Sequence, residues 1–243
     1  MKKNKLTQEP RYLIDGENLP WAVSESYRTL RTNIIFSQAD SPIRSLLITS
    51  SIPEEGKSMT SANLAITFAL ARNKVLLVDS DLRRPVLHRL FELSNTIGLT
   101  HLLVGTVEPE EIYQTTRVDN LWVVTSGLIP PNPSELLGSQ KMRSFLDLAQ
   151  KSFDIVLFDS PPVTSMADAA ILASLAGNVL LVVRANSTNR DMILRAKQQL
   201  ETVNSRIIGV VLNSVDLKKE RYYYNYYYYY YYSSYYGYEE KKN

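Results

Sequence analysis

The chain has 243 residues, of which 44% are hydrophobic and 21% are charged, and its formal net charge is only +2. This composition suits one sizeable domain with its own core, and it argues against nucleic acid as a partner because no basic groove is implied. The absence of cysteine excludes disulfides and thiolate chemistry, and two histidines without partners at metal-ligand spacing exclude a structural zinc site. No leader segment or long apolar run is found, so we expect a cytoplasmic protein that only a partner could hold at a membrane.

After a flexible segment at residues 1–20, the first predicted element is a helix over residues 21–38. An apolar stripe recurs there at helical spacing and consists of Val23, Tyr27, Leu30 and Ile34. Glu25, Arg28 and Arg31 lie off this stripe, and their spacing of three places them in a band about 120° wide. Spacing alone leaves two interpretations open: a surface salt bridge between Glu25 and Arg28, or an ionic contact surface for a neighbouring subunit.

From residue 44 onward, short β-branched or leucine-rich runs alternate with longer segments of helical period. The predicted strands cover residues 45–49, 74–79, 121–125, 154–159, 178–183 and 206–213. The predicted helices cover residues 58–71, 139–151, 167–176 and 190–203, and Ser134 is expected to cap a further short helix. The alternation predicts an α/β fold in which helices flank both faces of a mostly parallel sheet. Each strand is nearly continuous in apolar residues, which predicts burial on both faces.

Between the first strand and its helix lies the run Ser51-Ile-Pro-Glu-Glu-Gly56-Lys57-Ser58, which fits a phosphate-binding loop with Ser51 in place of the first glycine. Backbone amides of residues 55–59 would meet phosphate oxygens, Lys57 would neutralise the β and γ phosphates, and the Ser58 hydroxyl would bind Mg²⁺. Gly56 would supply the conformation and clearance of the turn. A plain capped helix would leave Lys57 unexplained. The predicted nucleotide-binding residues are Ser51, Glu54, Glu55, Gly56, Lys57, Ser58, Met59 and Asn213.

Two further predicted strands end in carboxylates. Asp79 ends the predicted strand at residues 74–79, and Asp81 follows two residues later. Asp159 ends the predicted strand at residues 154–159. The carboxyl ends of parallel strands form the edge where ligands bind in open α/β sheets. Phosphoryl transfer requires metal ions on the phosphate oxygens and a group that orients or deprotonates the incoming hydroxyl. We therefore predict Lys57, Asp79 and Asp81 as catalytic residues, with Asp79 as the base, and Ser58, Asp81 and Asp159 as magnesium ligands; the division between Asp79 and Asp81 stays open.

The tail at residues 217–243 contains most of the sixteen tyrosines of the chain. These tyrosines are Tyr222, Tyr223, Tyr224, Tyr226, Tyr227, Tyr228, Tyr229, Tyr230, Tyr231, Tyr232, Tyr235, Tyr236 and Tyr238. The run has neither strand alternation nor helical period, which predicts a solvated, disordered segment whose hydroxyls are candidate phosphate acceptors. Asn213, at the end of the last predicted strand, is expected to contact the adenine through its amide. About nine residues separate Asn213 from Tyr222, and this linker spans at most ~30 Å when it is extended. An aggregation-prone aromatic segment is the alternative.

Taken together, these features resemble the bacterial tyrosine kinases of capsular and exopolysaccharide synthesis, in particular the separate cytoplasmic kinase subunit of Gram-positive bacteria. The resemblance covers nearly the whole chain and rests on five elements: Glu25-x-x-Arg28-x-x-Arg31, the phosphate loop, Asp79-Ser-Asp81-Leu-Arg83-Arg84-Pro85, Asp159-Ser-Pro-Pro162 and the tyrosine cluster. It implies the fold of the chromosome-partitioning and division-site ATPases, with a kinase domain over residues 21–216.

The resemblance also implies how the protein works. It implies autophosphorylation with ATP and Mg²⁺ on tail tyrosines of neighbouring subunits, assembly of a ring through the helix at residues 21–38, and regulation of polymer synthesis and export. A transmembrane polysaccharide co-polymerase modulator would activate the kinase at the inner face of the membrane, and a cognate tyrosine phosphatase would reverse the modification. Two other functions stay open: a P-loop ATPase switch and a nucleotide-sensing scaffold, both without kinase activity. The absence of an early lysine between Ser50 and Glu55 argues against the switch.

Overall fold

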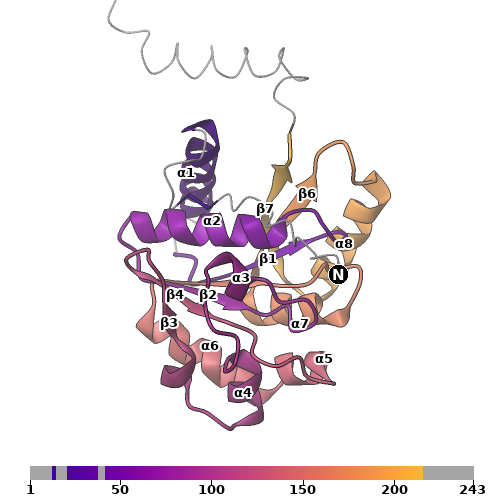
Figure 1. Ribbon diagram of the computed structural model, residues 1–243. Helices are drawn as coiled ribbons and strands as arrows, with labels where there is room; N and C mark the ends of the chain where they lie inside the picture. Colours follow the sequence, from indigo (N-terminus) through magenta and orange to yellow (C-terminus); the bar gives the residue numbers. More distant parts are fainter. Residues whose placement is uncertain (1–12, 15–20, 38–41, 216–243) are drawn as a thin grey trace, which may run out of the picture. The chain divides into compact units, whose positions relative to one another are not determined.

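The computed structural model describes residues 13–14, 21–37 and 42–215 (Figure 1). The tyrosine tail and most of the predicted N-terminal segment lie outside these residues. Within the described part of the chain, a seven-stranded sheet has the order β3-β4-β2-β5-β1-β6-β7. Its strands are β1 (Ser45–Ser50), β2 (Val75–Asp79), β3 (Gln114–Thr115), β4 (Leu121–Val124), β5 (Ile155–Asp159), β6 (Asn178–Arg184) and β7 (Arg206–Asn213). Neighbouring strands are parallel except for β3 and β4.

Helices cover both faces of the sheet (Figure 1). One face carries α1 (Trp21–Phe36), α2 (Lys57–Leu70) and α3 (Leu87–Leu90). The other face carries α4 (Leu99–Val104), α5 (Pro133–Leu137), α6 (Gln140–Ser152), α7 (Ala167–Ala176) and α8 (Arg190–Thr202), and a 3-10 turn, η1 (Pro109–Ile112), precedes β3. The strand pleat separates the two cores, because Leu47 of β1 packs in one and Leu46 and Ile48 pack in the other.

The predicted α/β fold is confirmed, and each predicted strand and long helix is present with ends shifted by at most two residues. The elements α3, α4, η1 and β3 were not predicted, because they are too short to show a period. The prediction that Ser134 caps a helix is wrong. Asn132 occupies the cap position of α5, and Ser134 lies inside the helix with its hydroxyl bonded to Asp168 Oδ1.

Strand β7 differs from the expectation that every strand is buried on both faces. It forms the edge of the sheet beside β6, and Val210 and Leu212 are 58% and 57% exposed. Its apolar run therefore reflects partial burial on an edge strand. Its carboxyl end nevertheless lies at the same edge of the sheet as those of the other parallel strands, because Asn213 pairs with Arg184 at the end of β6.

Helix α1 packs through part of its predicted stripe, since Ile34 is only 3% exposed and Leu30 packs in the same core. Glu25 and Arg28 form an exposed ion pair of 3.0 Å, as one interpretation of the sequence expected. Arg31 does not continue this outward band. Its guanidinium donates to the Thr67 carbonyl of α2 at 2.9 Å, so it fastens α1 to the domain.

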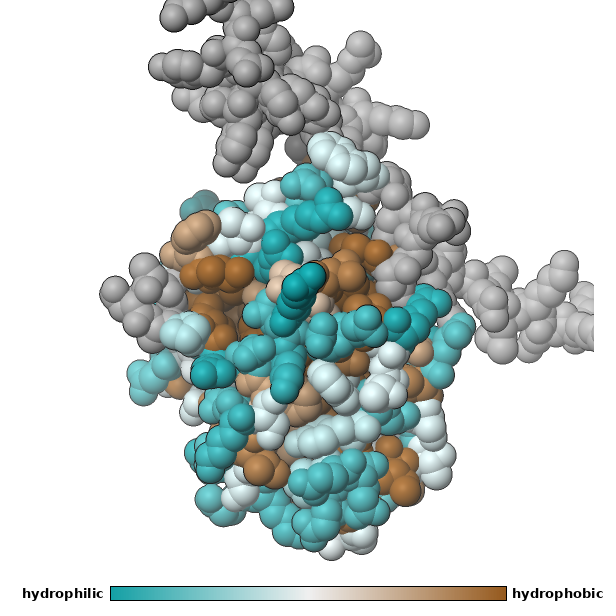
Figure 2. All heavy atoms as spheres, turned by 90° about the vertical axis from the view of Figure 1, so that its left-hand side faces the viewer, coloured by the Kyte–Doolittle hydropathy of each residue, from teal (hydrophilic) through white to brown (hydrophobic). Residues whose placement is uncertain are grey.

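The outer side of α1 exposes large apolar side chains: Trp21, Ile35 and Phe36 are 60%, 53% and 76% exposed. Figure 2, which shows the left-hand side of Figure 1, has apolar patches separated by hydrophilic side chains. Exposed apolar groups that gather on one element are typical of contact surfaces. Among the described residues, every helix is too short or too polar to cross a bilayer.

We predict that Arg31→Ala lowers the free energy of unfolding by about 1 kcal/mol, because it removes a hydrogen bond to a partly buried carbonyl. Arg28→Ala serves as the control and should change it by less than about 0.5 kcal/mol, since an exposed pair three residues apart contributes little. Urea denaturation of both variants measures the difference. Equal losses would contradict the inward placement of Arg31.

Candidate active site

The loop between β1 and α2 turns sharply at Gly56, which has φ +89° and precedes the first residue of α2. A Cβ at this position would lie 2.0 Å from Asn213 Nδ2, so a larger residue would both strain the backbone and collide with β7. Asn213 Nδ2 donates to the Glu55 carbonyl at 2.9 Å. The end of β7 is thus joined directly to the predicted phosphate loop, and a nucleotide contact by Asn213 stays a prediction.

Glu55 holds the loop in place. Its side chain is buried, and its carboxylate accepts from the Ile52 amide at 2.8 Å, from the Arg184 amide at 3.1 Å and from the Thr188 hydroxyl. A carboxylate with three donors fixes the loop against the end of β6. Sequence reasoning placed Glu55 in the nucleotide site but missed this role, because Arg184 and Thr188 lie far away along the chain.

Lys57 meets two of the predicted acids. Its Nζ lies 2.9 Å from Asp81 Oδ2 and 4.0 Å from Asp159 Oδ1, and it donates to the Ser58 hydroxyl at 3.2 Å. Only 13% of the Lys57 side chain is exposed, and Asp159 is fully buried. Burial alone would lower the pKa of Lys57, but the charges of Asp159 and Asp81 raise it above its usual value. The lysine therefore keeps its charge inside the fold.

Asp159 anchors this cluster from the end of β5. Its Oδ1 accepts from the Ser61 hydroxyl at 3.1 Å. Burial raises the pKa of its carboxyl, and the charge of Lys57 and hydrogen bonds from Ser58 and Ser61 counteract that rise. The predicted metal set of Ser58, Asp81 and Asp159 is therefore gathered around a single cation, Lys57.

Asp79 lies beside this cluster but has different partners. Its Oδ2 accepts from the amides of Val86 at 3.1 Å and Leu87 at 2.9 Å, at the start of α3, and no part of the residue is exposed. Burial, reinforced by the charge of Asp159, raises the pKa of Asp79 to about 8. Asp79 and Asp81 thus occupy distinct environments although they are two residues apart.

The buried polar atoms of the site fit a phosphate and a divalent metal. Ser51 Oγ, Asp79 Oδ1 and Asp159 Oδ2 are buried and have no hydrogen-bond partner within the described residues. Those residues contain no cluster of three or more carboxylate, imidazole or thiolate groups suited to a metal. Mg²⁺ commonly uses one or two carboxylates with phosphate oxygens and water, so Asp81, Asp159 and the Ser58 hydroxyl are an adequate protein contribution.

The loop that carries Asp81 is tied to the opposite helical layer by Arg83. Arg83 Nε donates to Asp168 Oδ2 at 2.7 Å, and Arg83 Nη2 donates to Asp168 Oδ1 at 3.2 Å. The Ser134 hydroxyl donates to the same carboxylate. Burial alone would raise the pKa of Asp168, but the hydrogen bonds from Arg83 and Ser134 hold it below its usual value. The sequence analysis included Arg83 in the motif that follows Asp79, but no local sequence pattern identified Asp168 as its partner.

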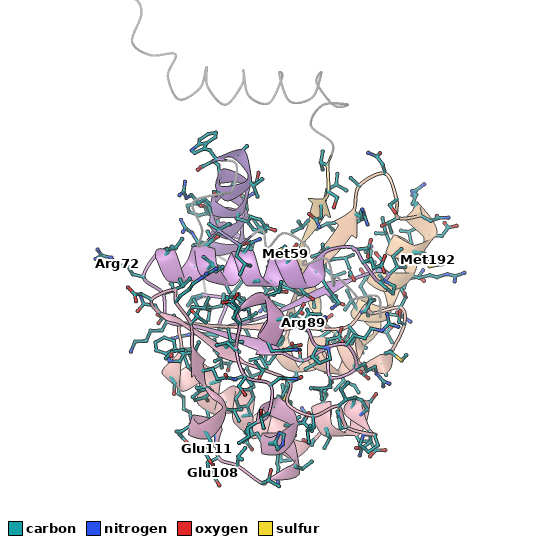
Figure 3. The ribbon with its side chains drawn as sticks, in the orientation of Figure 1. Met59, Arg72, Arg89, Glu108, Glu111 and Met192 are labelled. Carbon is teal, nitrogen blue, oxygen red and sulfur yellow. The ribbon has the colours of Figure 1, made fainter. Side chains whose placement is uncertain are left out.

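Two predicted nucleotide-binding residues lie outside the charged cluster. Glu54 is exposed and has φ +65°. The half-buried Met59, in the first turn of α2 (Figure 3), packs against the core on that side of the sheet. Both can contribute through the backbone, as the phosphate-loop pattern requires.

Comparison with known proteins identifies the family to which this chain belongs. The AAA domain family matches residues 55–210. Tyrosine-protein kinase YwqD of Bacillus subtilis (strain 168) is 42% identical over 219 residues, which are 90% of this chain and 92% of the relative. The chain belongs to the bacterial tyrosine-kinase family. Membership of this P-loop family implies a protein-tyrosine kinase that binds ATP together with a divalent metal.

Solved structures agree with this kinase assignment. The crystal structure of the chimerical protein CapA2B2 has a TM-score of 0.81 at 38% identity and covers 86% of this chain and 92% of its own. The cell division ATPase MinD of Pyrococcus furiosus has a TM-score of 0.61 at 24% identity, over 70% of this chain and 71% of its own, and shows the fold alone. The predicted relation to the division-site ATPase fold is therefore confirmed.

For this kinase we predict that Glu55→Gln lowers the free energy of unfolding by about 1–3 kcal/mol, because an amide leaves part of the three-donor site unsatisfied. Glu54→Gln is the matched control on the adjacent, exposed residue and should change it by less than about 0.5 kcal/mol. Chemical denaturation provides the measurement. A Glu55→Gln protein as stable as the control would show that the carboxylate does not hold the loop.

Proposed function

We propose that this kinase transfers the γ-phosphoryl group of ATP to tyrosines in the C-terminal tail of a neighbouring subunit. The phenolic oxygen forms a bond to the γ-phosphorus, the bond between that phosphorus and the bridging oxygen breaks, and ADP leaves. The observation that supports this most strongly is the gathering of Lys57, Asp81 and Asp159 at the edge where β1, β2 and β5 end. A site with these groups suits phosphate and metal better than any other ligand class.

Lys57, Ser58 and the two acids have separate tasks in this proposal. Bound Mg²⁺ would neutralise charge on the β and γ oxygens, held by Ser58, Asp81 and Asp159. Lys57 would then exchange Asp81, which it contacts at 2.9 Å, for phosphate oxygens. Because the ammonium is already buried and oriented by carboxylates, its charge is in place before transfer begins.

We assign Asp79 as the base that accepts the phenolic proton. One oxygen is fixed by two backbone amides, and Oδ1 has no partner among the described residues. A tyrosine phenol titrates near ~10, so a neighbouring carboxylate must help to remove its proton as the new bond forms. Because burial raises the pKa of Asp79 to about 8, the ionised form that acts as the base becomes more abundant as the pH rises through about 8. Since Asp79 is fully buried, the surrounding chain must move to admit a phenol.

We propose that the kinase assembles as a ring through α1. The exposed ion pair of Glu25 and Arg28, together with exposed Trp21, Ile35 and Phe36, supports a contact surface there. Each phosphate on the tail would add about −1.5 to −2 charge, so multiply phosphorylated tails would repel one another and loosen the ring.

The same proposal places the protein in the cytoplasm, at the inner face of the membrane, with three kinds of partner. A transmembrane polysaccharide co-polymerase modulator would activate it, a tyrosine phosphatase would reset it, and other copies would supply the tails. Cycles of phosphorylation and release would regulate polymerisation and export of a capsular or extracellular polysaccharide. The tyrosine-rich sequence of residues 222–238 and the kinase family support this placement.

We predict that Asp79→Asn binds Mg-ATP within about threefold of the unaltered protein but transfers phosphate about 100-fold or more slowly, because the proton acceptor is lost. Phosphotyrosine mass spectrometry of the full chain, incubated with Mg-ATP and an activating partner, measures transfer, and calorimetry measures binding. Lys57→Met is the companion variant and should lose tail phosphorylation while remaining folded. Failed nucleotide binding in Asp79→Asn would reassign Asp79 to the metal, and normal phosphorylation of soluble Lys57→Met would refute the site.

A further inference from the structure

The segment that follows β2 presents two arginines at the rim of the proposed active site. The Arg84 amide donates to Asp81 Oδ1 at 3.0 Å. Arg89 lies on α3, whose first amide, that of Leu87, is held by Asp79 at 2.9 Å. The carboxylates of the site therefore fix the backbone from which both arginine side chains extend.

Both guanidinium groups are exposed, and no carboxylate among the described residues pairs with them. Arg84 and Arg89 are exposed, and within the described part of the chain no carboxylate forms an ion pair with either. Arg83, next to them, is instead fastened to Asp168. Figure 3 labels Arg89 on α3 and Met59 in the first turn of α2, and the two helices contact each other in the same core, so α3 lies against the helix that follows the phosphate loop.

The positive charge of this segment comes from the arginines. Burial lowers the pKa of His88, and the neighbouring charge of Arg89 lowers it further, so His88 adds less positive charge than an ordinary histidine would. Two exposed guanidinium groups beside a site proposed to produce phosphotyrosine are suited to its phosphate, because guanidinium binds phosphate through two parallel hydrogen bonds. Clusters of arginine are a recurrent means of recognising phosphorylated peptides.

The tyrosine run of the unmodified tail offers these arginines no charge. Residues 222–238 consist of tyrosine, asparagine, serine and glycine, without an acidic or basic residue. The first transfer changes this, since one phosphotyrosine carries about −1.5 to −2 charge at neutral pH. The tyrosine run of a second copy therefore carries negative charge only after it has been phosphorylated once, and the acidic residues that flank it, Glu220, Glu239 and Glu240, are outnumbered by basic ones.

We propose that Arg84 and Arg89 form a docking surface for phosphotyrosine, which captures a phosphorylated tyrosine of a neighbouring copy's tail and keeps the next tyrosine near the catalytic acids. This rests on the function proposed above. Such docking would make the kinase processive: a tail that has received one phosphate would be favoured for the next transfer. Consecutive tyrosines are only about 3.5 Å apart along an extended chain, so a docked phosphate leaves several hydroxyls within reach of the site.

Peptide binding tests the docking surface without requiring catalysis. A labelled peptide of residues 222–238 with one phosphotyrosine should bind the dephosphorylated full chain about tenfold or more tightly than the unmodified peptide. The double variant Arg84→Gln/Arg89→Gln should bind both peptides within about twofold of each other, whereas Arg143→Gln, which alters an exposed arginine of α6, should retain the preference. Equal binding of both peptides to the unaltered chain would overturn the proposal. Undiminished preference in the double variant would also overturn it, as would equally tight binding of a peptide with glutamate in place of the phosphotyrosine.

Intact mass spectrometry of the activated full chain separates this inference from the proposed function. At early times the unaltered chain should contain unmodified and multiply phosphorylated molecules with few intermediates, and the double variant should pass through singly phosphorylated molecules first. If the unaltered chain acquires no phosphate on its tail, the proposed function fails. If the double variant gives the same distribution as the unaltered chain, the function stands and the docking surface is refuted.

Discussion

The site depends on one buried cation. Lys57 places its ammonium group 2.9 Å from Asp81 and 4.0 Å from Asp159, with little exposure to water. A buried charge is costly unless it is paired, and these carboxylates keep the lysine charged within the fold. The same groups are the ones that phosphate and metal require, so the arrangement that stabilises the lysine also prepares the site for a nucleotide.

The rest of the fold positions that cation. Glu55 ties the loop to the end of β6, and the close approach of Asn213 to Gly56 ties it to the end of β7. On the other side, Arg83 secures the segment that carries Asp81 to the layer of α5 and α7. Each contact joins segments far apart in the sequence, so the loop is held by the sheet and the helices around it.

Features that depend on local sequence patterns, namely the strands and the phosphate loop, could be predicted from the sequence. Continuous apolar runs revealed the parallel strands, and the Gly56-Lys57-Ser58 run between a strand and a helix located the phosphate loop. Long-range contacts could not be predicted, because nothing near Glu55 or Arg83 identifies a partner about a hundred residues away. Arg31 shows the limit within one helix: its spacing matched Glu25 and Arg28, but only the packing of α1 on α2 decided that it points inward.

A crystal structure of the full chain with Mg²⁺ and a non-hydrolysable ATP analogue tests this account most directly. We predict that the Lys57 ammonium leaves Asp81 and lies about 3 Å from oxygens of the β and γ phosphates, while Asp81 and Asp159 face the metal. A nucleotide bound elsewhere, with Lys57 still paired to Asp81, would contradict the central claim.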